Sequence, residues 1–184
     1  MSRLKSSRGK ILDAAEAIVL ESGAGHMTLD AVAERAEVSK GGLLYHFPSK
    51  EALLKGMLQR LLTLLEERQN EKGKRLTEEP GGEIKAFILS RVERDPKREQ
   101  MGSAVLAAVA HGPTLLQPAR EEIRRRLAGM LRSGLSFERA AVIFFAVQGL
   151  TLLELLSLSP LSVKERKDFV GELLRLADEE DRRD

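Results

Sequence analysis

The sequence has no cysteine and few aromatic residues. None of its 184 residues is cysteine, and 4% are aromatic. The missing cysteine excludes disulfides, thiol catalysis and cysteine-ligated zinc or iron–sulfur sites. It is compatible with a reducing cytoplasm, which is the location we expect. The scarcity of aromatic residues, set against abundant leucine and alanine, favours helices over sheets.

Long apolar runs are absent as well. No N-terminal apolar core resembles a signal peptide. The most apolar stretch, residues 140–153, falls short of the ~18 residues that suggest a membrane span. We therefore expect a buried helix there and no membrane partner. Hydrophobic residues make up 42% of the chain and charged residues 32%, which is the composition of a globular protein.

The sequence offers little for catalysis or metal binding. Its histidines, His26, His46 and His111, are scattered without metal-ligand spacing. Nucleophile elbow, phosphate loop and H-E-x-x-H motifs are all missing. The acidic pairs Glu66-Glu67 and Glu121-Glu122 look like solvated helix surface. We expect no catalytic residue, no metal and no cofactor, so an enzyme is the disfavoured class.

The net charge of +2 is small, but the charge is unevenly distributed. The first ten residues contain Arg3, Lys5, Arg8 and Lys10 and no acidic residue. A basic arm of this kind suggests a phosphate-rich partner. A disordered terminus that keeps the protein soluble is an equally good interpretation of the arm by itself.

Helical periodicity covers nearly the whole chain, and no alternating strand pattern is present. A first helix ends at Ser22-Gly23, and Thr28, Ser39 and Ser49 are good N-caps for the next three. The fourth helix is predicted at 50–72, followed by a loop at 73–82. Later helices are expected at about 83–94, 97–111, 114–133, 136–158 and 162–180. Capping boxes open two of these, at Thr114 with Gln117 and at Ser162 with Glu165.

The most informative region is residues 8–54. Two short helices there are separated only by Glu37-Val38 and the capping Ser39, and a longer first helix braces them. This arrangement predicts a helix-turn-helix, in which the second short helix enters the major groove of DNA.

The composition of the second short helix supports that interpretation. Gly41 and Gly42 each cost about 1 kcal/mol relative to alanine inside a helix. The missing side chains make sense if the helix must approach another surface closely, and a duplex is a natural candidate. Lys40 and Lys50 stand in first turns, where the helix dipole disfavours a cation. Phosphates would reverse that preference, although both lysines could simply be solvated.

The stretch ILDAAEAIVLESGAGHMTLDAVAERAEVSKGGLLYHFPSKEALL resembles the N-terminal domain of TetR-type regulators. The positions that agree, at fixed spacing and without a gap, include Ala14-Ala15, Thr28-Leu29, Val38-Ser39, Lys40-Gly41, Phe47 and Ser49-Lys50-Glu51. The resemblance implies an all-α protein. Residues 1–48 would form a three-helix helix-turn-helix DNA-binding domain, and residues 49–184 a helical bundle for ligand binding and dimerisation.

The resemblance also implies which residues contact DNA. The expected set is Thr28, Ser39, Lys40, Gly41, Gly42, Tyr45, His46 and Lys50. Tyr45 and His46 could each donate a hydrogen bond to a phosphate, although His46 could instead brace the first helix. Leu44 replaces a tyrosine that is common in the family, and Glu37 replaces the usual glycine of the turn. Both departures support an alternative, an interaction protein that kept the helix-turn-helix shape with weak or lost DNA binding.

The C-terminal part is expected to form the dimer and to hold a ligand. Residues 136–158 are apolar on all sides, so this helix must be covered all round. We expect a second subunit to cover one face, with 162–180 as the second interface element; the alternative is the central helix of a monomer. Candidate ligand residues are Met57, Phe87, Met101, His111, Phe144, Gln148 and Thr151, although core packing is the commoner role for such residues.

The predicted function is therefore that of a DNA-binding transcriptional regulator, most simply a repressor. It would bind a palindromic double-stranded operator as a homodimer, since twofold symmetry in the DNA requires it in the protein. A small-molecule effector would release it. The sequence does not identify the effector or the operator.

Overall fold

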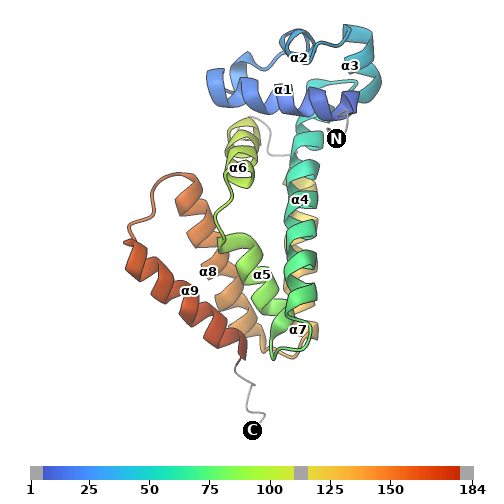
Figure 1. The fold of residues 1–184 in the computed structure, drawn as a ribbon. Helices are drawn as coiled ribbons and strands as arrows, with labels where there is room; N and C mark the ends of the chain where they lie inside the picture. Colours follow the sequence, from blue (N-terminus) through green and yellow to red (C-terminus); the bar gives the residue numbers. More distant parts are fainter. Residues whose placement is uncertain (1–5, 110–115, 179–184) are drawn as a thin grey trace. The chain divides into compact units, whose positions relative to one another are not determined.

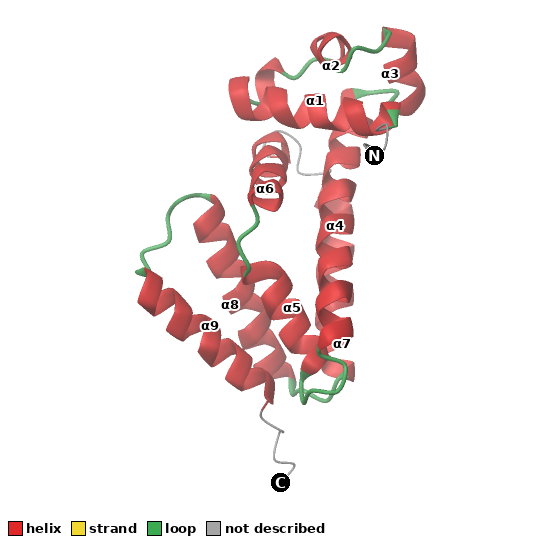
Figure 2. Cartoon of the chain, viewed as in Figure 1, coloured by secondary structure: helices red, strands yellow, loops and turns green. Residues whose placement is uncertain are grey.

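The computed structural model describes residues 6–109 and 116–178 (Figure 1). Every regular element in these ranges is a helix, which confirms the all-α prediction (Figure 2). The elements are α1 (Ser7–Ser22), the 3-10 turn η1 (Ala24–His26), α2 (Leu29–Arg35), α3 (Lys40–His46), α4 (Lys50–Arg75), α5 (Gly82–Val92), α6 (Pro96–Val109), α7 (Gln117–Arg132), α8 (Phe137–Leu155) and α9 (Val163–Asp178). His111, Thr114, Arg3 and Lys5 lie outside the described residues.

Side-chain caps determine where several helices begin. The hydroxyl oxygen of Thr28 accepts a hydrogen bond from the Ala31 amide at 3.1 Å, and that of Ser39 accepts one from the Gly42 amide at 3.0 Å. Ser162 forms the expected capping box: its hydroxyl accepts from the Glu165 amide at 3.3 Å, and its own amide donates to the Glu165 carboxylate at 2.8 Å. Each of these bonds satisfies a backbone donor that the first turn of a helix leaves without a partner. These predicted N-caps are therefore confirmed.

The fourth helix is longer than expected. It continues to Arg75, so the predicted loop at 73–82 is too long at both ends. Lys72, Lys74 and Arg75 occupy the last turn, where cations interact favourably with the helix dipole. Gly81 caps α5 in the left-handed conformation, with a φ of 63°. A Cβ at Gly81 would lie 2.0 Å from the carbonyl oxygen of Ala177, so only glycine fits this close contact with α9.

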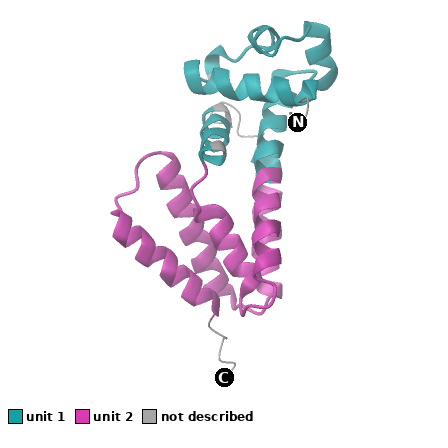
Figure 3. Cartoon of the chain, in the orientation of Figure 1, with its two compact units in different colours: residues 1–62, 96–119 teal, residues 63–95, 120–184 magenta. Residues whose placement is uncertain are grey.

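Packing divides the chain into two compact units (Figure 3). Unit 1 comprises residues 1–62 and 96–119, and unit 2 comprises residues 63–95 and 120–184. The division falls inside α4, which contributes to both units. The domain boundary expected at 48/49 rests on the helix-turn-helix motif and stays a prediction.

The core of unit 1 forms where α1 packs against α2, α3 and α6. Leu43 and Phe47, one helical turn apart, are buried in it as expected. Gly56 lets α4 approach this core closely, because a Cβ there would lie 2.6 Å from Cε1 of Phe47. The burial of Leu43 and Phe47 in this core fixes the orientation of α3 within unit 1.

The core of unit 2 forms where α5 packs against α8 and α9. The rings of Phe87 and Phe144 stack with centroids 5.8 Å apart and 12° between their planes. Arg166 ties α9 into the unit by pairing with Glu154 at 2.5 Å and donating to the Val92 carbonyl. Within the described ranges, no helix combines the length and the apolar character that crossing a membrane requires.

Candidate nucleic-acid interface and a charged cavity

The turn between α2 and α3 contains a strained residue. Glu37 adopts a φ of 55°, in the left-handed region that costs a non-glycine residue about 1 kcal/mol or more. The Val38 amide closes the turn by donating to the Ala33 carbonyl at 3.0 Å. The tight turn places Ser39 to begin α3.

The buried side chains of α3 determine which face it presents outward. Leu43 is fully buried and Phe47 is 3% exposed, so Gly41, Leu44 and Tyr45 lie on the exposed side. Tyr45 is 85% exposed, an unusual position for a large aromatic side chain. These three residues are neighbours on the helix surface because of their i, i+3 and i+4 spacing. On the outward face of α3, the backbone is therefore uncovered at Gly41, whereas the side chain of Tyr45 extends into solvent.

The two glycines of α3 have different surroundings. A Cβ at Gly42 would lie 3.2 Å from the Ser39 hydroxyl oxygen, so the capping contact of the chain itself favours glycine there. A Cβ at Gly41 would meet no atom within 4 Å. No contact within the described residues therefore explains why residue 41 is a glycine, although glycine is less favourable than alanine in a helix.

Charged side chains flank α3. Lys40 pairs with Asp30 of α2 at 2.8 Å, a contact that the sequence reasoning missed. Both side chains are mostly exposed, and such pairs contribute about 0–1 kcal/mol. The pair therefore orients Lys40 without preventing it from binding another anion. Lys50 is exposed in the first turn of α4, after the N-cap Ser49.

The remaining residues of the predicted DNA set lie around the same helix. Thr28 and Ser39 are exposed at the starts of α2 and α3. His46 is half-buried, and its ring meets the Tyr45 ring edge-on with centroids 5.2 Å apart. Arg8, from the basic arm, lies with its guanidinium 5.2 Å from the centroid of the Phe47 ring. The fold thus gathers residues of α2, α3 and the start of α4 on one unit.

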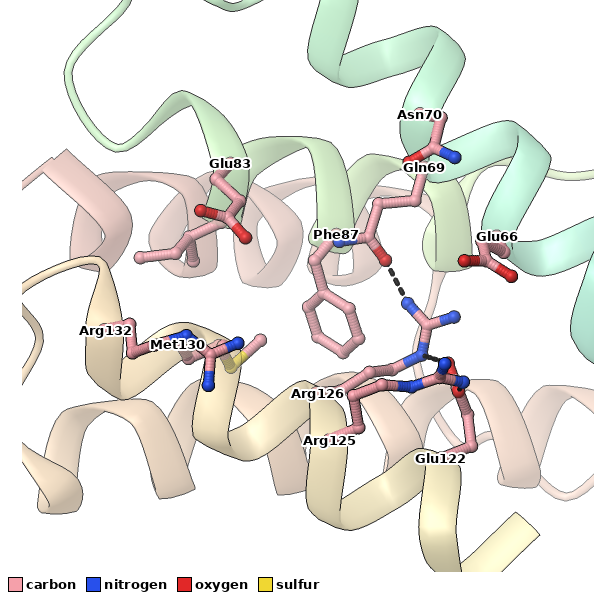
Figure 4. A pocket seen from close by; sticks show the side chains of 12 residues that line it. Glu66, Gln69, Asn70, Glu83, Phe87, Glu122, Arg125, Arg126, Met130 and Arg132 are labelled. Carbon is pink, nitrogen blue, oxygen red and sulfur yellow. Dashed lines mark hydrogen bonds and ion pairs between the residues drawn. The ribbon is translucent and has the colours of Figure 1, made fainter. Parts of the chain in front are cut away.

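A cavity of about 180 Å³ opens in unit 2, between the second half of α4, α5 and α7 (Figure 4). Ile84, Phe87 and Met130 supply its apolar wall. The polar lining residues are Glu66, Gln69, Asn70, Glu83, Glu122, Arg125, Arg126 and Arg132. The cavity therefore combines a small apolar side with a larger charged one.

Arg126 and Glu122 are the buried ionic groups of this cavity. Their side chains are 11% and 8% exposed, and the Nε of Arg126 pairs with the Glu122 carboxylate. Arg125, which is 67% exposed, pairs with the same carboxylate. The Nη1 of Arg126 donates to the side-chain oxygen of Gln69 on α4. Burial lowers the pKa of Arg126 to about 10, even though the nearby charge of Glu66 acts to raise it.

The predicted ligand residues are distributed over both units. Met57 and Met101 are buried in unit 1, whereas Phe87, Phe144, Gln148 and Thr151 belong to unit 2. Of these, Phe87 lines the cavity. His111 lies outside the described residues. The ligand role of the whole set stays a prediction.

The sequence reasoning overlooked the charged wall of the cavity. It treated Glu121-Glu122 as solvated surface, and this is wrong for Glu122, which is 6% exposed. The physical reason is that Glu122 lines the cavity and has arginine partners three and four residues along α7. That i, i+3 and i, i+4 spacing was the available signal, although it is equally common on exposed helices.

Comparisons with known proteins place these features in context. The curated transcriptional repressor KstR of Rhodococcus jostii, strain RHA1, is 36% identical over 97 residues, which is 53% of this chain. The alignment spans 44% of that relative, so the chain matches less than half of its length.

Solved structures of low sequence identity share the fold. A transcriptional regulator from Rhodococcus sp. Rha1 superposes with a TM-score of 0.74 at 22% identity, covering 94% of this chain and 96% of that one. The SmeT–triclosan complex gives a TM-score of 0.72 at 18% identity, with 93% and 91% covered. The multidrug binding protein EbrR complexed with imidazole gives 0.70 at 21% identity, with 98% and 99% covered.

Family-level matches cover both parts of the chain. Residues 11–57, which include α2 and α3, match the family described as bacterial regulatory proteins, tetR family. Residues 81–178 match the tetracyclin repressor-like C-terminal domain, and this match alone spans more than half of the chain. The chain belongs to the TetR family of bacterial regulatory proteins.

Proposed function

We propose that this protein is a transcriptional repressor that binds a palindromic operator as a homodimer and is released by a small-molecule effector. The outward face of α3 is the observation that carries the proposal. This face combines an 85% exposed Tyr45 with a Gly41 whose missing side chain nothing in the described chain explains. Such a combination suits a helix inserted into the major groove, because it allows close backbone approach and supplies a side chain that reaches base edges or phosphates.

We assign separate roles to the residues around this face. Lys40 and Lys50 bind phosphates at the starts of α3 and α4, where the helix dipole favours an anion. Thr28 and Ser39 cap their own helices, and their exposed hydroxyls also contact phosphates. Gly41 and Gly42 allow close approach, while Tyr45 and His46 contact phosphate or a thymine methyl at the far end of α3.

Titration of a labelled duplex tests the DNA assignment. The duplex carries the region upstream of the chain's own gene, and anisotropy is recorded at rising salt. We expect affinity to fall steeply with salt and Lys50→Ala to weaken binding to every duplex, since each phosphate contact adds to the salt slope. Lys164→Ala in α9 removes one charge elsewhere and should leave the affinity unchanged. Salt-insensitive or undetectable binding would favour the alternative interaction protein, to which the exposed Leu44 and Glu37 point.

The dimer is proposed on the apolar surface of unit 2. Large apolar side chains that α8 and α9 leave exposed are Phe137, Val142, Phe145, Leu152, Leu153, Val163 and Phe169. Phe145 alone is 66% exposed. Monomeric proteins rarely leave so many such groups uncovered, whereas a second copy would bury them across a twofold axis.

Sedimentation velocity tests the dimer. We expect the wild type to sediment as a dimer and Phe145→Glu to sediment as a monomer, because a charge would be buried without a partner. Ile123→Glu on α7, where the side chain is 42% exposed, is the matched control and should stay dimeric. A wild-type protein that remains monomeric at micromolar concentration would refute this part of the proposal.

We propose the unit 2 cavity as the effector site. The named relatives support a ligand-responsive function, since SmeT was solved with triclosan and EbrR with imidazole. Three lining residues, Glu66, Gln69 and Asn70, belong to α4, the helix that begins directly after the helix-turn-helix. An effector that prefers one arrangement of α4 would shift the population away from the state that matches the groove spacing of about 34–36 Å.

A further inference from the structure

We propose that the effector is an anionic molecule with an apolar body, and that its acid group binds Arg126. The inference rests on the proposed function, because it names the chemical class that the unit 2 cavity accepts. A carboxylate would bind the guanidinium of Arg126, while the apolar body would lie against Ile84, Phe87 and Met130 (Figure 4).

The number of charges around the cavity does not show whether it favours an anionic or a cationic ligand. Three glutamates and three arginines line it, so burial has to be considered. Glu66, Glu83 and Arg132 are exposed, and water screens their charges. Among the lining residues, Arg126 and Glu122 are the ionic groups whose side chains are largely taken out of water, so their charges are screened least.

The buried carboxylate is better compensated than the buried guanidinium. Glu122 has two cationic partners, Arg125 and Arg126. Within the described part of the chain, Arg126 pairs with the single carboxylate of Glu122 and donates to the neutral Gln69, although a guanidinium carries five N–H donors. The lowered pKa of Arg126 agrees with this imbalance, since burial, together with the charge of Arg125, outweighs the nearby charge of Glu66. A ligand anion therefore gains more here than a ligand cation, which would have to displace two arginines from Glu122.

The same contact suggests how the effector acts on α4. The Nη1 of Arg126 donates to Gln69 and so links α7 to α4 inside unit 2. A carboxylate that accepts the Nη1 N–H now donated to Gln69 competes with Gln69 for that donor. Binding would exchange the link to α4 for a contact with the ligand. Arg126 would thus both recognise the acid and control the position of α4.

Matched probes test the chemical class on the full-length protein. Octanoate and 4-phenylbutyrate are compared with their neutral counterparts 1-octanol and 4-phenylbutanol, and with octylammonium, by isothermal titration calorimetry. We expect at least one acid to bind about tenfold or more tightly than its alcohol, as a charge-assisted hydrogen bond provides. If no acid binds more tightly than its alcohol, or if octylammonium binds best, the inference is wrong.

Variants test the assignment to Arg126. Arg126→Gln should remove the difference between acid and alcohol, and Arg126→Lys should retain part of it, since the charge remains but the planar fork is lost. Arg124→Gln, an exposed neighbour outside the cavity lining, should behave like the wild type. A melting curve establishes that each variant is folded. If Arg126→Gln does not fold, the comparison of the wild type with Arg126→Lys decides, and full acid preference in the lysine variant would overturn the assignment.

The DNA titration separates this inference from the function on which it rests. If the ligand-free protein binds duplex with steep salt dependence but no acid prefers Arg126, the inference fails and the repressor proposal stands. If no duplex is bound at low salt, the repressor proposal fails whatever the acids do. Release of the duplex by the same acid that Arg126 binds would support both.

Discussion

Gly41→Ala is expected to stabilise the fold while weakening DNA binding. A Cβ at this position meets no atom within 4 Å, so the methyl group costs nothing in the free protein. Alanine in place of glycine in a helix gains about 0.5–1 kcal/mol, partly by restricting the unfolded chain. For a chain of this size the melting temperature should rise by about 2–4 °C per kcal/mol. In the groove, the same methyl group would hold the backbone away from the duplex.

Gly42→Ala provides the matched contrast. Its Cβ would press on the Ser39 hydroxyl oxygen at 3.2 Å, the atom that caps α3. The N-cap hydrogen bond of Ser39 contributes about 1 kcal/mol. Strain on this bond should offset the free energy that alanine gains from its higher helix propensity. The melting temperature should therefore stay level or fall. Thermal melts followed by circular dichroism, together with anisotropy of a labelled upstream duplex, measure stability and affinity on the same samples.

For Gly41→Ala, stability and DNA affinity should change in opposite directions. We expect a higher melting temperature and an affinity lower by about tenfold or more, equivalent to about 1.4 kcal/mol of lost binding. A variant that melts higher and binds the duplex like the wild type would show that Gly41 does not serve close approach to DNA. A variant that melts lower would instead contradict the open space around this position.

Two further substitutions probe packing and charge. Gly56→Ala should destabilise the protein by about 1–3 kcal/mol in urea denaturation, because its methyl group would overlap the buried Phe47 ring; Gly171→Ala in α9, with nothing within 4 Å, should not destabilise it. Hydrogen bonds from Ser162 lower the pKa of Glu165, so their stabilising effect is present above the unfolded pKa of about 4.3 and is lost as pH falls through the folded value. Glu165→Gln should therefore lose less stability than the wild type between pH 7 and pH 3, and an equal loss would contradict this origin.

Local signals allowed much of unit 1 to be predicted from the sequence. Thr28 and Ser39 cap the helices they were expected to cap, and Glu37, where the family usually has glycine, adopts a positive φ. Each of these features depends on neighbours within a few positions of the chain. The burial of Leu43 and Phe47 followed in turn from helical spacing.

Features that depend on distant partners could not be predicted in the same way. The Asp30–Lys40 pair joins two helices, and its geometry depends on how the turn between them folds. Glu122 carries the sequence signature of an exposed helix face, yet tertiary packing buries it at the wall of the cavity. Helical periodicity shows which residues share a face, but it does not show how deeply a polar face is covered.

The acidic residues beside α3 favour recognition that depends on more than charge. Asp30 pairs with Lys40, and Glu37 is exposed in the turn, so both reduce the positive potential next to the proposed groove face. The net charge of +2 adds only weak long-range attraction for the duplex. Phosphate attraction supplies the sequence-independent part of affinity, whereas contacts to base edges supply the discrimination. Because the acidic residues weaken the attraction to phosphates, a larger share of the binding free energy should come from the contacts of Gly41 and Tyr45 with a particular base sequence.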